Sequence, residues 1–246
     1  MSEFRFGKHP VKSDYRTLRF QDFLLPSLAP PPPSFDTLPR VFDGTGSSDP
    51  ATLFPMDGND QYGDCTIAAL AHAITVYNGY AGRTAIPDQQ LVVKLYFNLT
   101  HGIDSGLPEL DVLNYWQSHE VDGEKIAAFV RIGRKNLTHI QQAIQLFGGV
   151  YLGFQVPENC QHEFNDGMPW TPGPLTNDGH AVYAVGYDEE GVTVLTWGAT
   201  QRATWDWWGE CVDEAYAILS AEALVDGFAP GFDSAALARA LKAVAN

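Results

Sequence analysis

The stretch GNDQYGDCTIAALAHAI, residues 58–74, changes character at Cys65. Glycine, amide and carboxylate residues precede the cysteine, and an alanine-rich apolar pattern with helical spacing follows it. This pattern predicts a helix from Cys65 to about residue 78, with Asp64 as its N-cap. A thiol at a helix start lies beside unpaired N–H groups and the positive end of the helix dipole, and both favour the thiolate. The stretch therefore indicates a reactive cysteine.

A reactive thiolate needs a site for the oxyanion that its attack creates. The N–H groups at the helix start supply part of that site, and an amide side chain from Asn59 or Gln61 supplies the rest. Gly63 allows a tight turn and leaves room for a substrate chain. We expect Gly63 and Asp64 to line the substrate side of the site.

The thiolate also needs a base, and His180 is the best candidate for it. It stands at the start of a predicted strand, directly after the flexible pair Asp178–Gly179. His72 lies on the helix of Cys65 but two turns away, which is too far to meet it. The other histidines lie in predicted loops or on polar faces.

The periodicity of the chain predicts an α+β fold with three segments. Residues 1–57, which contain LLPSLAPPPPSF at 24–35, read as an extended proline-rich arm; residues 58–228 form the main domain; residues 229–246 form a C-terminal helix capped by Asp233 or Ser234. Within the main domain we expect helices over 65–78, 87–99, 108–118 and 137–147, and strands over 125–132, 148–156, 180–188, 191–198 and 215–220.

Composition excludes several classes of function. The chain has 246 residues, a formal net charge of −15 and only three cysteines, so it predicts neither nucleic-acid binding nor a disulfide framework or metal site. No apolar run is long enough to cross a membrane, and the first residues lack the apolar stretch of a secretory signal. We expect a cytoplasmic protein with no cofactor and no membrane partner, or one incorporated in a particle. Residues 1–40 carry six basic and four acidic residues, so a weakly basic arm accompanies an acidic body.

The motifs GNDQYGDCTIAAL and GHAVYAVGYD…VTVLTWG…WWGE…AYAIL resemble those of the papain-like cysteine peptidase superfamily, in the same order over about residues 56–220. The resemblance implies a two-lobed fold, in which a helical lobe supplies Cys65 and a barrel-like antiparallel sheet supplies His180. Substrate would lie in the cleft between the lobes, along Gly63 and Gly179. Trp197 corresponds to the tryptophan that shields the orienting contact of the histidine.

The chain departs from the family pattern at two places. The family has an asparagine two residues before the tryptophan, where this chain has Leu195, which has no acceptor for the imidazole N–H. Thr196 could replace it if the strand bulges, and Asp178 or Gln201 could reach the ring. The oxyanion glutamine of the family corresponds to Asn59, which is shorter by one methylene but still a donor.

Two functions follow as expectations. The first is a thiol hydrolase that cleaves a peptide, isopeptide or related amide bond, or runs transamidation or deamidation with the same groups. The second is a catalytically impaired binding or structural subunit of a homo- or hetero-oligomeric assembly, such as a virion or secretion particle, tethered by residues 1–57. A third role for that arm is a pro-segment that lies across the cleft.

Overall fold

The computed structural model describes residues 4–221 and 229–244. Its helices are η1 (Phe20–Phe23), α1 (Leu38–Thr45), α2 (Pro50–Leu53), α3 (Cys65–Tyr80), α4 (Gln89–Leu99), α5 (Glu109–Ser118), α6 (Leu137–Phe147), α7 (Cys160–Asn165), α8 (Trp205–Cys211) and α9 (Ser234–Val244). Its strands are β1 (Phe35–Asp36), β2 (Ala128–Arg131), β3 (Val150–Pro157), β4 (Leu175–Tyr187), β5 (Gly191–Thr196), β6 (Ala199–Thr204) and β7 (Val212–Leu219). The expected α+β class is confirmed.

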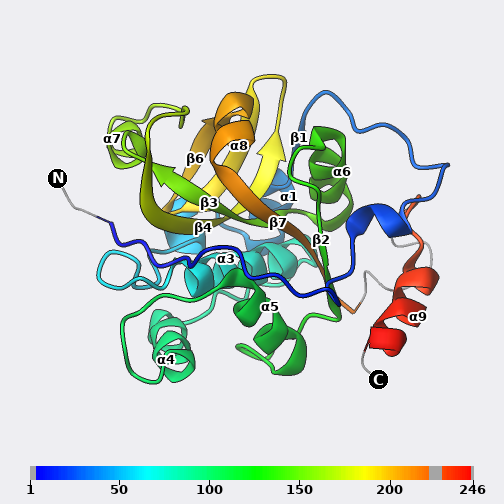
Figure 1. Ribbon diagram of the computed structural model, residues 1–246, viewed down its shortest axis with the longest axis horizontal. Coiled ribbons are helices and arrows are strands. Elements are labelled where there is room, and N and C mark those ends of the chain that lie inside the picture. Colours follow the sequence, from blue (N-terminus) through cyan, green and yellow to red (C-terminus); the bar gives the residue numbers. More distant parts are fainter. Residues whose placement is uncertain (1–3, 222–228, 245–246) are drawn as a thin grey trace.

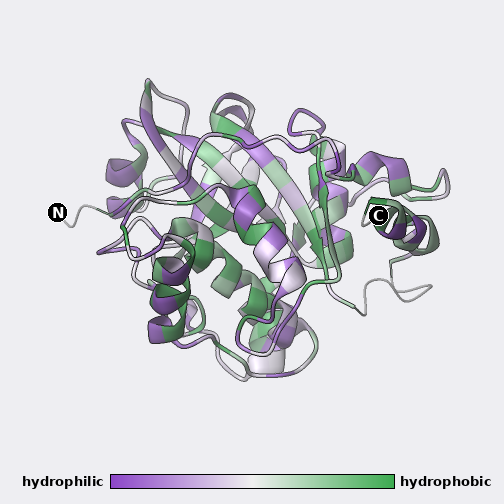
Figure 2. Cartoon of the chain, turned by 60° about the horizontal axis from the view of Figure 1, so that its bottom comes forward, coloured by the Kyte–Doolittle hydropathy of each residue, from purple (hydrophilic) through white to green (hydrophobic). Residues whose placement is uncertain are grey.

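The strands form one antiparallel sheet with the order β2-β7-β3-β4-β5-β6, and β1 pairs with β4 beside this path. Its residues alternate between two faces, as strand geometry requires. On β4, Val182 and Ala184 face a core that α6 and α8 cover, whereas Ala181, Tyr183 and Val185 face a second core built around α3. The sheet therefore separates two apolar cores, and Figure 2 shows hydrophobic residues along the elements at the centre of the molecule.

Helix α3 is buried along almost its whole length, because it lies between the sheet and the shorter helices. Its small residues let neighbouring elements approach closely. A Cβ on Gly79 would lie 2.6 Å from Cγ1 of Val41 on α1, and a Cβ on Gly44 of α1 would lie 1.9 Å from the carbonyl oxygen of Gly79. The start of α3 is held against the sheet by a different contact, because Tyr151 on β3 donates a hydrogen bond to the carbonyl of Thr66 at 2.8 Å.

The N-terminal arm crosses the molecule between the sheet and the helices α4 and α5, as the dark blue segment of Figure 1 shows. It then reaches β2 through a bridge between Arg19 and Arg131, and η1 places Phe20 and Phe23 in the core beside the C-terminal segment. The arm is therefore part of the fold from its first described residues.

The second half of the expected arm is not extended. Residues 38–45 form α1, which has a proline in its first turn and ends at Gly46 in the left-handed conformation, and residues 50–53 form α2. Proline at a helix start and glycine after its end are ordinary helix boundaries, so the interpretation of residues 1–57 as one extended arm was wrong for residues 38–45 and 50–53.

Other boundaries also moved. The second predicted helix begins not at Pro87 but after Asp88, whose carboxylate accepts from the N–H groups of Gln90 and Leu91. The C-terminal helix spans Ser234–Val244 and not the expected 229–246, and Asp233 is its cap through a 2.7 Å bond from Ala236 N–H. The predicted domain boundary at residue 228 and the last two residues, 245–246, lie outside the described residues.

Candidate active site

Cys65 is the first residue of α3, and its side chain is buried. The sulfur lies near two backbone N–H groups that favour its thiolate form, those of Ala181 on β4 and of Gly7 in the arm. Ala181 directly follows His180, so the fold brings the predicted nucleophile against the strand that carries the predicted base. Burial raises the pKa of the Cys65 thiol to about 12, although the two N–H groups act in the opposite direction.

His180 is buried in a cage of aromatic rings. Its imidazole stacks on the indole of Trp197 with centroids 4.7 Å apart, and the rings of Phe154 and Phe6 meet it edge-on at 5.5 and 5.7 Å. Burial lowers the pKa of the imidazole to about 3. With the arm in place, the thiol and the imidazole are therefore both neutral near pH 7.

The orienting contact of His180 comes from Thr196. Its Oγ1 lies 2.9 Å from Nε2 of His180, whereas Nδ1 is buried and has no hydrogen-bond partner within the described part of the chain. Leu195 points to the opposite face of the sheet, into the core around α3. Strand alternation thus places Thr196, not its predecessor, on the face of the histidine.

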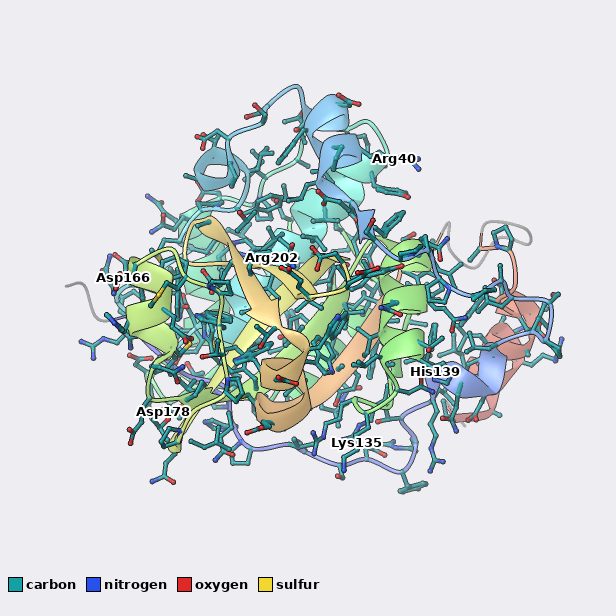
Figure 3. All side chains as sticks on the ribbon, turned by 90° about the horizontal axis from the view of Figure 1, so that it is seen from above. Arg40, Lys135, His139, Asp166, Asp178 and Arg202 are labelled. Atoms are coloured by element: carbon teal, nitrogen blue, oxygen red, sulfur yellow. The ribbon has the colours of Figure 1, made fainter. Side chains whose placement is uncertain are left out.

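The other two candidates for that contact do not make it. Gln201 donates to the carbonyls of Met168 and Arg202. Asp178 is exposed, and Figure 3 shows it at the periphery of the molecule. Of the candidates that the sequence offered, Thr196 alone contacts the ring among the described residues.

Asn59 is buried, and its amide has a defined orientation. The indole N–H of Trp197 donates to Oδ1 at 2.9 Å, and an indole nitrogen is only a donor, so the NH₂ group must point the other way. That group donates to the carbonyls of Arg5 in the arm, at 3.0 Å, and of Tyr62, at 3.1 Å. The amide donor of Asn59 is therefore directed at backbone carbonyls, one of which belongs to the arm.

Gln61 and Asp64 occupy different environments. Gln61 is exposed, and no side-chain bond ties it to the site. Asp64 occupies the N-cap position of α3, but its carboxylate does not cap the helix, and neither oxygen has a hydrogen-bond partner among residues that the structure describes. Burial raises the pKa of Asp64 to about 8, so this side chain holds a proton near neutral pH.

The arm runs along the seam between the two catalytic candidates. Lys8 N–H donates to the carbonyl of Gly179 at 3.0 Å, and the N–H of Leu107 donates to the carbonyl of Gly7 at 2.8 Å. Further along, His9 N–H donates to the main-chain carbonyl of Leu107, and nearer the N-terminus Arg5 N–H donates to the main-chain carbonyl of Asn59. Residues 5–9 are thus held by main-chain hydrogen bonds between Gly179 on one side and Asn59 and Leu107 on the other, in the way that an extended peptide is bound. The path between these residues is called the groove below.

Glycines make room for this crossing. A Cβ on Gly7 would lie 1.8 Å from the carbonyl oxygen of Gly63, and a Cβ on Gly106, whose φ is +74°, would lie 2.1 Å from the carbonyl oxygen of Gly7. On the sheet side, a Cβ on Gly179 would lie 2.4 Å from the carbonyl oxygen of Lys8. Gly63 and Gly179 therefore contact the chain in the groove, where the sequence places the substrate.

Aromatic residues of the arm close the site over Trp197. The ring of Phe4 stacks on that indole with centroids 4.3 Å apart, and Phe6 packs on both the indole and the imidazole of His180. Trp197 itself has a φ of +47° in the two-residue turn that joins β5 and β6, a conformation that is uncommon for a bulky residue. The stacking and its bond to Asn59 hold it there.

The fold of this chain recurs in known structures. Similar folds include xylellain, a cysteine protease from Xylella fastidiosa (TM-score 0.62, 17% identity, 89% of this chain and 98% of that one), and the cysteine protease CMS1MS2 of Carica candamarcensis in complex with E-64 (TM-score 0.56, 17% identity, 77% and 99%). Procathepsin L 3 from the larval midgut of Tenebrio molitor is also similar (TM-score 0.51, 13% identity, 83% and 76%).

The chain therefore has the fold of the papain-like cysteine peptidase superfamily, as its motifs predict. At 13–17% identity the likeness concerns the fold. A scan against protein-family models and a search of curated proteins found no match. Over the residues described, no helix is both long and apolar enough to cross a membrane.

Proposed function

We propose that the chain is a peptidase or related amide hydrolase with Cys65 as nucleophile and His180 as base, and that residues 4–9 keep it latent. The observation that carries this proposal is the path of the arm. The groove beside the thiol already holds an extended peptide by main-chain hydrogen bonds on both walls, to Gly179 and to Leu107. A groove that binds one extended peptide in this way suits another as substrate.

The arm is placed as a ligand and not as a substrate. The sulfur of Cys65 meets the N–H of Gly7, whereas attack requires a carbonyl carbon at that position. The amide of Asn59 is engaged by the carbonyl of Arg5. The nucleophile and the oxyanion donor are therefore both occupied by groups that do not lead to cleavage.

Once the arm leaves, water reaches the thiol and the imidazole, and the burial that holds them neutral is relieved. The thiol proton passes to Nδ1 of His180, and the sulfur attacks the carbonyl carbon of a bound amide. The amide of Asn59 and the N–H of Cys65 stabilise the negative oxygen. The imidazolium then protonates the leaving nitrogen, and water hydrolyses the thioester to a carboxylic acid and the free thiol. An amine in place of water would give transamidation.

The second candidate function is a binding or structural subunit whose groove stays filled. The observation that favours it is the continuation of the arm into the core at Phe20 and Phe23, which makes residues 4–23 more than a detachable leader. In that case the thiol would keep its raised pKa throughout the life of the protein, and the arm would serve assembly.

A cut in the arm after folding tests the proposal. A recognition sequence for a site-specific protease is inserted after Ser13, in an exposed stretch, and the folded chain is cut there. We expect the rate of Cys65 alkylation by iodoacetamide at pH 6 to rise more than about a hundredfold on release of the N-terminal peptide, because the thiolate becomes accessible. Cleavage of unfolded protein substrates should appear at the same time and be absent in Cys65→Ala.

The buried Cys211 is the internal control, because it lies in the core on the other face of the sheet and its alkylation should stay slow. If Cys65 remains as slow as Cys211 after the N-terminal peptide has left, the peptidase proposal fails and the structural candidate stands.

A further inference from the structure

The side chain of Lys8 leaves the arm and enters the interior. It is 1% exposed, and its Nζ lies 3.0 Å from Oδ2 of Asp213 and 3.1 Å from Oε1 of Glu214. The ammonium also donates to the carbonyl of His9 at 3.0 Å. Lysine is rarely buried to this extent, and only where acceptors surround its ammonium group.

The Lys8 pocket, formed by Glu109, Gly153, Asp213 and Glu214, has the shape of this side chain. A Cβ on Gly153 would lie 1.9 Å from Cε of Lys8 and 2.6 Å from Oε1 of Glu109, so the stem of the lysine fills the space that this glycine leaves open. Gly153 lies on β3, Asp213 and Glu214 lie on β7, and Glu109 is the first residue of α5.

Glu109 points into this pocket without a partner of its own. It is fully buried, and neither carboxylate oxygen has a hydrogen-bond partner in the ranges 4–221 and 229–244. Burial and the neighbouring Glu214 raise its pKa well above the ordinary value, and Lys8 acts against that shift. Without Lys8, the buried carboxylates of the pocket would therefore have no cation beside them among the described residues.

The acidic residues of the pocket keep the ammonium group of Lys8 charged. Burial lowers the pKa of Lys8, but attraction to Glu109, Glu214 and Asp213 outweighs it and leaves the pKa raised, so the side chain stays charged. Tyr216 donates to the second oxygen of Glu214 at 2.8 Å and fixes that carboxylate. Among the described residues, no group of three or more His, Cys, Asp or Glu is arranged to hold a metal ion.

The pocket belongs to the groove that the thiol faces. The residue that fills it follows directly after Gly7, whose N–H meets the sulfur of Cys65, and its own N–H pairs with Gly179 beside His180. Any extended chain that takes this path presents one side chain to the pocket at that position.

We propose that the Lys8 pocket is a recognition site for a lysine side chain, and that peptides bound in the groove are selected for lysine at the position that Lys8 occupies. This inference rests on the proposed function for its biological meaning, but it concerns binding. Lys8 then occupies the position that a lysine side chain of a separate bound peptide would take.

Peptide exchange on the cut chain tests this inference. The Cys65→Ala form of the chain with the protease site after Ser13 is cut, and fluorescent peptides with the sequence of residues 4–12 compete with the released segment. We expect a peptide with norleucine in place of Lys8 to bind about thirty-fold more weakly or worse, because it keeps the stem but leaves buried carboxylates unpaired.

The matched control is norleucine in place of Lys12. That lysine pairs with Asp111 at 2.6 Å on the surface, where the two side chains are 53% and 41% exposed, so its loss should change affinity less than about threefold. Equal affinities for the lysine and norleucine peptides at position 8 would overturn the inference.

A measurement on the intact chain covers the case in which the cut protein does not exchange its peptide. Lys8→Met should lower the unfolding temperature clearly more than Lys12→Met, since only the former leaves buried carboxylates without their cation. Equal unfolding temperatures would again overturn the inference.

The two proposals fail in distinguishable ways. If the chain binds the lysine peptide selectively but cleaves nothing, the proposal of a lysine-binding pocket stands and the proposal of a peptidase fails. If it cleaves peptides with no preference for lysine, the proposal of a peptidase stands and that of the pocket fails.

Discussion

Thr196 Oγ1 lies 2.9 Å from Nε2 of His180 and is the polar contact that orients this ring. A hydroxyl both donates and accepts, so it supports either tautomer of the imidazole, whereas the amide oxygen that the papain-like pattern uses only accepts. The chain therefore retains an orienting group despite the leucine at position 195, but one that does not by itself fix which ring nitrogen carries the proton.

The first prediction concerns this contact. Thr196→Val keeps the shape of the side chain and removes the hydroxyl, so the ring of His180 loses its direction. We expect kcat of the cut chain to fall roughly a hundredfold with little change in KM. Thr196→Ser is the matched control and should stay within about threefold of the parent. Equal rates for the valine and serine variants would show that the hydroxyl does not position the base.

The second prediction concerns the bond between Trp197 and Asn59. Trp197→Phe keeps a stacking ring but removes the N–H that holds Oδ1 of Asn59, so the amide can turn its oxygen toward the cleft. We expect kcat to fall by about tenfold or more, since an oxyanion donor is lost in part of the molecules. Trp205→Phe removes a comparable bond, to the carbonyl of Asp188, away from the site and should leave kcat unchanged. A kcat equal to that of the parent chain in Trp197→Phe would show that the amide of Asn59 does not stabilise the oxyanion.

The third prediction concerns the crossing of the arm in the uncut chain. Gly7→Ala introduces a Cβ 1.8 Å from the carbonyl of Gly63, a contact that backbone atoms cannot relieve, so the arm must shift. We expect Cys65 in this variant to be alkylated at least about tenfold faster at pH 7 than in the parent chain. Gly133→Ala, at a position with open space around it, is the control. Alkylation at the parental rate would mean that the arm does not restrict access to the thiol.

The fourth prediction concerns stability against pH. The pKa of Asp64 is raised by burial to about 8, against about 3.9 in an unfolded chain, so the native state holds a proton that the unfolded state releases. Stability from this group is present below pH 4 and is lost as pH rises toward 8, by up to about 1.4 kcal/mol per unit. Asp57, also raised by burial to about 8, adds to the loss.

Two buried histidines change the free energy of unfolding in the opposite direction over the lower part of the range from about pH 4 to 8. The pKa values of His72 and His180 are lowered by burial to about 4 and about 3, so stability from these groups rises with pH until the unfolded histidines lose their protons near 6.5. The net loss should therefore appear between about pH 6.5 and 8. Asp64→Asn should remove about half of it in denaturant titrations, whereas Asp60→Asn, at an exposed residue, should not.

The site could be predicted from the sequence where short-range patterns carry it. The helix start at Cys65 has a local signature and is where it was predicted, whereas β4 begins at Leu175, five residues before the predicted strand start at His180. The pairing of Cys65 with His180 as nucleophile and base stays a prediction. The orienting residue could not be identified by counting back from Trp197, because the face of a strand residue depends on its register with β4. That register shifts between Ala184 and Gly186.

The path of the arm had no signal of its own in the sequence. Proline content indicates an extended conformation but not the surface on which the chain lies. The partners of Lys8 come from residues 109, 213 and 214, far away along the chain. In contrast, α1 had the ordinary boundary residues of a helix, Pro39 and Gly46, and it could have been recognised.

The glycines at the arm crossing have a consequence for related sequences. Gly63 and Gly179 leave space because another backbone passes over them, whereas Gly106 also needs glycine for its φ of +74°. A homologue that had lost the N-terminal segment would gain from side chains at positions 63 and 179, which would cover exposed backbone. These two positions should therefore drift toward larger residues together in lineages without the segment, and stay glycine wherever it is retained.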